Sequence, residues 1–148
     1  RAWGVSNLDT DDMQELFAQP DGTHCAANQV LYNVGSRGIE YDLLPLMRQH
    51  QIPVMAYCPL AQAGRLRRGL LNHPALRQIA GEHHATVPQI LLAFLLAQPG
   101  VLPIPRTGSA QHAQQNAAAA EIRLSAEELA LLDAAFPKPK RKTRLEIV

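Results

Sequence analysis

Residues 26–57, AANQVLYNVGSRGIEYDLLPLMRQHQIPVMAY, decide the fold class of this chain. A strand pattern runs from Ala26 to Asn33, apolar residues at helical spacing follow from Ile39 to His50, and a second strand pattern runs from Ile52 to Tyr57. Pro45 predicts that the regular part of the helix begins late in its segment. A strand, a helix and a strand in succession predict two parallel strands connected by a right-handed crossover.

The same alternation continues on both sides of this unit. Ahead of it, Ala2–Ser6 is predicted to be a short buried strand, and Thr10 is predicted to cap a helix with acidic residues in its first turn. Behind it, Pro59 begins a loop rich in Gly, Arg and Gln, and Val101–Pro105 is predicted to be the fourth strand. The remaining predicted helices run from about Pro74 to Glu82, from Thr86 through Leu95, from about Ser109 to Ala119, and from a capping box of Ser125 and Glu128 to just before Pro137.

Four parallel strands do not close a barrel, because closure takes about eight strands and typically about 250 residues. With 148 residues, the chain has about the size of half of such a barrel. It begins on a strand pattern without an initiator methionine, so we expect it to be a piece of something longer. The strands at Ala2–Ser6 and Val101–Pro105 would then have open edges, and the isolated chain is expected to self-associate or to pair with an N-terminal half.

The composition narrows the class of protein. Hydrophobic residues make up 47% of the chain, enough for a packed core, and the net charge of +1 gives no field of one sign to hold nucleic acid or an anionic membrane. No apolar run approaches the ~20 residues that span a bilayer, and the first residues do not resemble a signal peptide. These features predict a soluble cytoplasmic protein with free thiols at Cys25 and Cys58. The basic run Lys138–Arg144 is expected to be a solvated tail rather than a nuclear-localisation signal.

Several catalytic and metal-binding patterns do not occur in the sequence. The six histidines are scattered without the HExxH spacing of a zinc site. No GxSxG segment marks a nucleophile, and no GxGxxG turn marks a Rossmann-type nucleotide site. We therefore expect neither a metal centre nor an α/β-hydrolase.

Polar residues gather at the predicted strands and directly after them. Ser6 and Asn7 end the first strand, Gln29 lies in the second, Tyr57 ends the third and Arg106 follows the fourth. Parallel strands of a barrel present their C-terminal ends at one mouth, where such folds place their sites. Taken singly, these residues would also suit a turn, a core aromatic and a solvated rim charge. The collinear set favours one binding site.

Four motifs carry a resemblance to the aldo-keto reductases, closest to the bacterial branch of that family. The motifs are Trp3-Gly4-Val5-Ser6-Asn7, Asn28-Gln29-Val30-Leu31-Tyr32-Asn33, Ala56-Tyr57-Cys58-Pro59-Leu60, and Ile104-Pro105-Arg106-Thr107-Gly108-Ser109 continuing through His112 to Asn116-Ala117-Ala118. The resemblance covers essentially the whole chain. It implies that residues 1–148 are a single partial domain, a parallel (β/α) half-barrel formed by the C-terminal four βα units of a TIM-type (β/α)8 barrel, with a tail at 137–148.

The resemblance also implies a function and a cofactor. Aldo-keto reductases reduce aldehydes and ketones to alcohols by hydride transfer from NADPH. In the family, the residues matching Ser6, Asn7 and Gln29 hydrogen-bond the nicotinamide carboxamide, and the tyrosine matching Tyr57 stacks on the nicotinamide ring. Backbone amides near Cys58, which replaces a common serine, and near Leu60 approach the pyrophosphate.

The loop after the fourth strand resembles the adenosine-phosphate site of the family. Arg106 stands where a lysine is usual, and Thr107, Gly108 and Ser109 lead into a helix N-terminus that favours anions. Arg106 and this helix suit the 2′-phosphate, so NADPH is preferred to NADH. His112 stands where many members have an arginine and binds phosphate less strongly. The residues matching Gln115 and Asn116 face the adenine.

The family's catalytic Asp, Tyr, Lys and His come from the first half of the barrel, and no residue here matches them. We therefore assign no catalytic residue, expect the chain to be inactive alone, and expect a small carbonyl substrate for the intact enzyme. Two other interpretations stay open at this point. One is a stand-alone nucleotide-binding or assembly module without catalysis, and the other is a flavodoxin-like open sheet that binds another nucleotide.

Overall fold

Four parallel strands form the sheet of this protein, and the computed structural model describes residues 1–148 in full. The strands are β1 (Val5–Ser6), β2 (Asn28–Leu31), β3 (Val54–Tyr57) and β4 (Val101–Pro103). They lie in the order β1-β2-β3-β4, so each strand pairs with the next along the chain and β1 and β4 form the two edges. The predicted α/β class with parallel pairing is confirmed.

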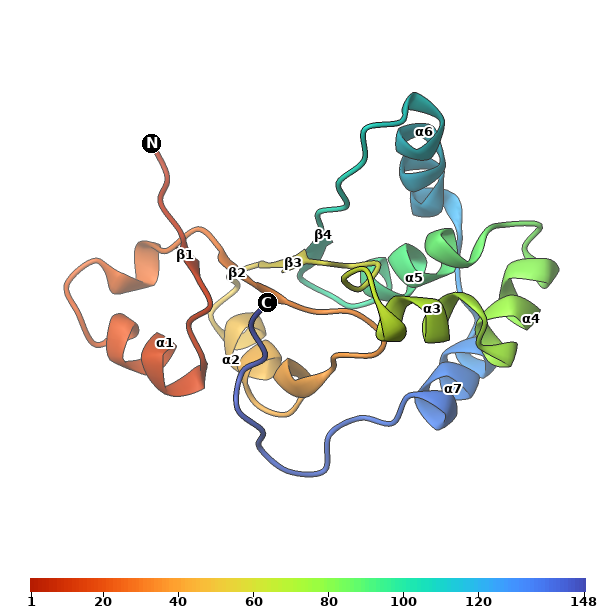
Figure 1. Ribbon diagram of the computed structural model, residues 1–148. Helices are drawn as coiled ribbons and strands as arrows, with labels where there is room; N and C mark the ends of the chain where they lie inside the picture. Colours follow the sequence, from red (N-terminus) through yellow and green to blue (C-terminus); the bar gives the residue numbers. More distant parts are fainter.

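Helices follow each strand and cover the sheet. They are α1 (Thr10–Phe17), α2 (Leu43–Gln49), α3 (Arg65–Leu71), α4 (Pro74–Glu82), α5 (Val87–Leu96), α6 (Ala110–Ala118) and α7 (Ala126–Ala135), with short 3-10 turns η1 (Gly22–His24), η2 (Gly38–Glu40) and η3 (Ala119–Glu121). Figure 1 shows α1 and α2 near β1 and β2, whereas α3, α4, α5 and α7 group on the far side of β3. None of the helices combines the length and the apolarity that crossing a bilayer requires.

The predicted capping box at Ser125 and the predicted cap at Thr86 open their helices as expected. The Ser125 hydroxyl accepts from the Glu128 amide while the Glu128 carboxylate accepts from the Ser125 amide, at the start of α7. Thr86 and Gln89 form the equivalent pair at the start of α5. Each box satisfies backbone donors that the first helical turn leaves free, so these boundaries follow from local chemistry.

The predicted cap of α1 is wrong by one residue. Asp9, not Thr10, has the extended backbone of an N-cap, and its carboxylate accepts a 2.8 Å hydrogen bond from the Thr10 amide. Asp12 completes the box by accepting from the Asp9 amide at 2.9 Å. Both residue types suit a cap, and Asp9 forms the complete capping box with Asp12, while Lys142 also binds its carboxylate.

Two further predictions need correction. The first strand is short and not buried, since β1 spans Val5–Ser6 and Trp3 remains 43% exposed on an edge that no other strand covers. The predicted loop after Pro59 contains the helix α3. Gly64 and Gly69 obscure the helical pattern of this segment, because glycine has a low helix propensity. Leu70 is only 2% exposed, so its burial in the core stabilises the helix.

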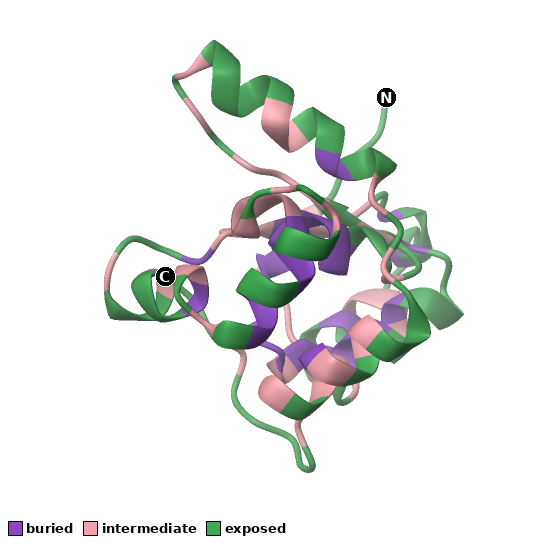
Figure 2. Ribbon diagram, turned by 90° about the vertical axis from the view of Figure 1, so that its right-hand side faces the viewer, coloured by how far each residue is buried: buried purple, intermediate pink, exposed green.

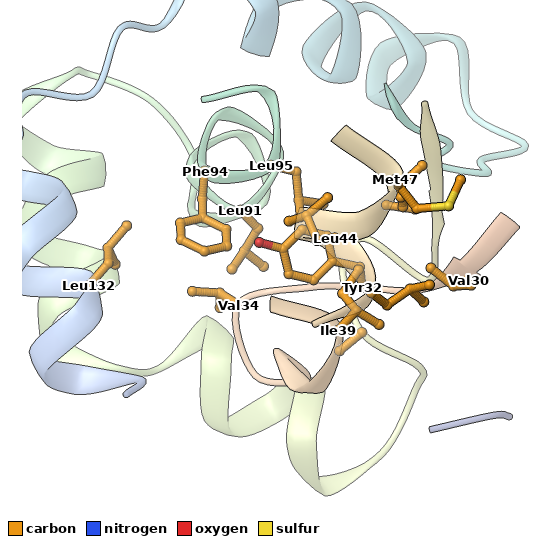
Figure 3. Packing of buried hydrophobic residues seen from close by; sticks show 14 of the residues in the cluster. Val30, Tyr32, Val34, Ile39, Leu44, Met47, Leu91, Phe94, Leu95 and Leu132 are labelled. Atoms are coloured by element: carbon orange, nitrogen blue, oxygen red, sulfur yellow. The ribbon is translucent and has the colours of Figure 1, made fainter. Parts of the chain in front are cut away.

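The core lies between one face of the sheet and the helices α2, α5 and α7. Val30 of β2 points into this core, and Tyr32 packs edge-on against Phe94 of α5 with ring centroids 6.3 Å apart. Figure 3 shows these side chains in one cluster, with Met47 of α2 on one side and Leu132 of α7 on the other. Apolar positions that carried the helical spacing, among them Leu43, Met47 and Phe94, therefore supply this core.

The opposite face of the sheet carries a row of side chains that runs across all four strands. The parallel register aligns Ser6 with Gln29, Gln29 with Met55, and Met55 with Leu102. Strand residues alternate between faces, and the neighbours Val54 and Ala56 are fully buried, so this row points away from the helical layer. Leu102 is accordingly 52% exposed. Two of the predicted site residues thus share one face at one level of the sheet.

Most residues of the C-terminal tail are exposed, as predicted, but Lys142 is also held by ion pairs. Lys142 forms ion pairs with Asp9 at the start of α1 and with Asp42 just before α2, the latter at 2.9 Å. Burial opposes the charge of Lys142, but its hydrogen bonds to the two carboxylates raise its pKa above the ordinary value. Figure 1 shows the tail returning from α7 toward α2, where Lys142 connects it to the starts of α1 and α2.

Candidate functional site

The turn after β1 is held in a defined conformation by β2. The backbone amide of Asn7 donates to the backbone carbonyl of Gln29 at 2.9 Å. Asn7 adopts a left-handed backbone with φ of 56°, which asparagine tolerates better than most residues. The buried Asn28 donates from its side chain to the Leu8 carbonyl at 2.8 Å. The polar pair Ser6 and Asn7 is therefore fixed at the edge of the sheet.

Tyr57 at the end of β3 contacts this turn directly. Its hydroxyl donates to Asn7 Oδ1 at 3.2 Å, and the Ser6 hydroxyl donates to the Gln29 carbonyl at 3.0 Å. These bonds leave the side-chain nitrogen of Asn7, Nδ2, as a free donor and the hydroxyl oxygen of Ser6 as a free acceptor. A planar amide of a ligand needs this combination of one donor and one acceptor.

A sharp turn after Tyr57 redirects the chain toward α3. Cys58 and Ala61 both have left-handed backbones, with φ of 48° and 56°. The Cys58 carbonyl accepts from Asn33 Nδ2 at 3.1 Å and from the Ala61 amide at 2.9 Å, so the turn is tied to the end of β2. Leu60 lines the cavity described next, and Cys58 is not part of that lining. Both cysteines are free thiols.

A cavity of about 390 Å³ lies between this turn, α3, the start of α5 and the helix α6. Its lining residues are Leu60, Arg67, Thr86, Pro88, Arg106, Thr107, His112, Gln115 and Asn116. Figure 2 shows α6 at the top of the molecule as exposed along nearly its whole length, and no residue of α6 itself is buried. The polar face of α6 therefore forms one wall of an open site and contributes little to the core.

The loop between β4 and α6 is shaped by its own side chains. The Thr107 hydroxyl accepts from the Ser109 amide at 3.1 Å, and the Ser109 hydroxyl caps α6 by accepting from the His112 amide at 3.4 Å. Gly108 lies exposed between them, and neither Gly108 nor Ser109 lines the cavity. These two residues thus set the course of the loop, which places Arg106 and Thr107 beside the first turn of α6.

The cavity has a positive lining with no carboxylate in it. Arg67 and Arg106 form no ion pair and no side-chain hydrogen bond with the protein. The amide side chains of Gln115 and Asn116 likewise have no protein partner, so their hydrogen-bonding groups face the site unused. Guanidinium groups bind phosphates through two parallel hydrogen bonds, and amides recognise ring nitrogens. The lining suits an anionic ligand that carries a polar ring.

The structure divides the predicted site residues into three groups. Ser6, Asn7, Gln29 and Tyr57 lie together at the sheet; Leu60, Arg106, Thr107, His112, Gln115 and Asn116 line the cavity; and Cys58, Gly108 and Ser109 shape the adjoining turns. Sequence reasoning missed Arg67, Thr86 and Pro88. The run of arginines at 65–68 was a usable signal for Arg67, but it lay in a segment that was predicted to be a loop.

Comparison with known proteins places these features in a family. The sequence model of the Aldo/keto reductase family matches residues 1–136. Methylglyoxal reductase YeaE of Escherichia coli is 57% identical over all 148 residues, which is 52% of its own length. Glyoxal reductase of Bacillus subtilis is 31% identical over 134 residues, covering 90% of this chain and 45% of the relative.

Solved structures agree with the sequence comparison. An aldo-keto reductase from Klebsiella pneumoniae, described in complex with NADPH, superimposes with a TM-score of 0.96 at 61% identity, covering 100% of this chain and 52% of that one. The chain therefore spans about half the length of the relatives that it matches. Because the family model covers most of the sequence, this chain belongs to the aldo/keto reductase family.

Proposed function

We propose that this chain is the NADPH-binding part of a reductase that converts aldehydes or ketones to alcohols by hydride transfer. The observation that carries the proposal is the cavity beside α6, in which two unpaired guanidinium groups and two unpaired amides face the same space without a carboxylate. The similar protein from Klebsiella pneumoniae is described in complex with NADPH. The residues present in this chain fit the charge and the hydrogen-bonding groups of that cofactor.

The adenosine end of the cofactor fits the wall formed by α6 and the loop before it. Arg106 and Thr107 would bind the 2′-phosphate beside the first helical turn, whose free amides carry partial positive charge. His112 adds a nitrogen to the same wall. Gln115 and Asn116, one turn further along α6, would hydrogen-bond the adenine edge.

The nicotinamide end fits the edge of the sheet. The Ser6 hydroxyl oxygen would accept from the carboxamide nitrogen, and the Asn7 side-chain nitrogen would donate to the carboxamide oxygen. Gln29 would be a third partner. The ring of Tyr57 would stack on the nicotinamide and fix the face that it presents. The bound cofactor supplies the hydride, and the residues of this chain bind and orient it.

We also propose that residues 1–148 are a single partial domain, the C-terminal four βα units of a (β/α)8 barrel, with residues 137–148 as its tail. The outer edges of β1 and β4 are unpaired, and the face carrying Met55 and the half-exposed Leu102 lacks a covering layer. A second set of four strands would pair with both edges and cover that face. The isolated chain would then self-associate or pair with such an N-terminal half, which light scattering measures.

The reaction itself needs groups that this chain does not bring to the site. A carbonyl that receives hydride must also receive a proton, and no residue of this chain matches the Asp, Tyr, Lys and His that the family uses for this chemistry. We therefore propose that the chain binds NADPH but does not catalyse alone. Because one relative is a methylglyoxal reductase, a small 2-oxoaldehyde is the first substrate to test in the intact protein.

Calorimetric titration of the protein expressed from its complete reading frame tests the cofactor assignment. We expect NADPH to bind more tightly than NADH, because Arg106 contacts a phosphate that NADH lacks. Arg106→Ala should weaken NADPH by roughly 1.5–3 kcal/mol, about tenfold or more, and change NADH less than about twofold. Arg77→Ala, an exposed arginine on α4, is the matched control. Equal losses for both nucleotides would remove the 2′-phosphate assignment, and no binding of either would contradict the function.

A further inference from the structure

We infer that Arg67 on α3 is a second phosphate-binding residue, which holds the pyrophosphate of the cofactor while Arg106 holds the 2′-phosphate. The inference deepens the proposed function and rests on it. It assigns a binding role to a helix that the sequence did not predict.

Helix geometry explains why Arg67, among the arginines of α3, reaches the cavity. Leu70 lies one turn after Arg67 on the same side of the helix and is buried in the core. This anchor turns the side chain of Arg67 toward the body of the protein, where it is half-buried and lines the cavity with Arg106. Arg65 and Arg68 are exposed and do not line it.

The charges of the cavity indicate a ligand with more than one phosphate position. Arg67 and Arg106 stay positively charged, and neither is neutralised by a protein carboxylate. Two like charges that face one cavity repel each other, and the repulsion is relieved when an anion binds between or beside them. A dinucleotide phosphate supplies such anions at two separate places.

The elements from which the lining residues come assign each arginine to one phosphate of the cofactor. Arg106 shares the α6 wall with Gln115 and Asn116, the proposed adenine partners. Arg67 comes from a different wall, formed by α3, the first helix after the Tyr57–Leu60 turn. In a dinucleotide the pyrophosphate lies between the nicotinamide and the adenosine. Arg67 therefore lies on the side of the cavity where the pyrophosphate would pass.

The test uses Arg67→Ala, Arg106→Ala and the matched control Arg68→Ala, each titrated calorimetrically with NADPH, NADH and adenosine 2′-monophosphate. The pyrophosphate is common to both dinucleotides, so Arg67→Ala should weaken NADPH and NADH by the same factor, about five- to tenfold. It should leave adenosine 2′-monophosphate, which has no pyrophosphate, within about twofold of the unmodified protein. Arg106→Ala should weaken NADPH and adenosine 2′-monophosphate, and Arg68→Ala should change none of the three.

Several outcomes would overturn the inference. If Arg67→Ala matches Arg68→Ala, Arg67 binds no phosphate; if it weakens NADPH more than NADH, its partner is the 2′-phosphate. Arg67→Lys keeps a charge without the planar fork and should give intermediate losses for both dinucleotides, which separates a lost contact from a damaged helix. A protein that binds neither dinucleotide would refute the proposed function itself, whereas tight binding unaffected by Arg67→Ala would refute this inference alone.

Discussion

Arginine occupies two opposite environments in this molecule. Arg37, just before η2, is only 5% exposed and donates to Glu40 at 2.6 and 2.8 Å, to Asp133 at 2.8 Å and to the Phe136 carbonyl at 2.6 Å. Arg106 and Arg67 face an open cavity without a protein partner. The same side chain thus serves the fold where the protein satisfies it, and is available for an external anion where the protein leaves it unpaired.

The buried arginine connects parts of the chain that are far apart in sequence. Its partners Glu40 and Asp133 lie in η2 and α7, and the Tyr32 hydroxyl also donates to Glu40 at 2.7 Å. Burial, and then the nearby Glu40 carboxylate, raise the pKa of Tyr32, so this tyrosine stays a neutral donor. The guanidinium also lies 5.1 Å from the centre of the Phe94 ring. This cluster fixes α7 to the core.

The largest effect should come from removing the paired arginine. Arg37→Ala leaves Glu40 and the Phe136 carbonyl without their donor in a buried site, and is expected to lower the free energy of unfolding by roughly 3–5 kcal/mol. Arg106→Ala should change it by less than about 0.5 kcal/mol, because Arg106 is exposed and unpaired. Urea unfolding followed by circular dichroism measures both variants. An equal loss of stability in the two variants would contradict the conclusion that Arg37 stabilises the fold and Arg106 does not.

Ionic strength should affect the exposed arginines of the cavity more than the buried Arg37. Raising ionic strength from about 0.05 to 0.3 M screens exposed charges strongly and buried pairs weakly. NADPH affinity at the cavity should fall by about fivefold, roughly 1 kcal/mol, while the contribution of Arg37 to stability, measured as the difference between the protein and its Arg37→Ala variant, should hold nearly constant. Calorimetric titrations and urea unfolding at the two salt concentrations provide the measurement. Salt-independent binding of NADPH would argue against phosphate contacts by the arginines.

The smallest expected effect concerns pH at the rim of the buried cluster. Burial opposes ionisation of Asp133, but hydrogen bonds from Arg37 and Lys138 hold its pKa below the usual value. Its contribution is therefore present above the unfolded pKa of about 3.9 and is lost as pH falls through the lower folded pKa. Asp133 is 37% exposed, so we expect only about 0.5 kcal/mol, seen as a shallower loss of stability in Asp133→Asn between about pH 4 and 2.5. Urea midpoints that decline in parallel for both proteins would contradict this.

Local chemistry made much of the fold predictable from sequence. The alternation of strands and helices, the parallel pairing, and the caps at Ser125 and Thr86 depend on residues a few positions apart, so their spacing predicts them. The motifs around Asn7, Tyr57 and Arg106 follow the strands in order, and for that reason they could be read as one site. The roles assigned to these residues remain predictions for the titrations to test.

Two of the errors, the missed helix α3 and the pairing of the tail, share a physical cause, because both depend on contacts between segments distant in sequence. Helix α3 depends on burial of Leu70, and the ion pairs of the tail join Lys142 to Asp9, 133 positions earlier. The cap at Asp9 is local, because its capping-box partner Asp12 lies three positions away. Arg67 enters the site only because helix α3 exists.

The sequence by itself determined the order of the elements, their class and the motifs of the family, since these follow from local patterns of polarity and hydrogen bonding. Only the tertiary structure decided which arginine is satisfied and which is free. Arg37 meets Asp133 across 96 positions, whereas Arg106 lines a cavity that has no carboxylate. Glu40 lies only three positions after Arg37, but the sequence does not show that this pair is buried. The partners of a charged side chain come from the packing of the whole chain.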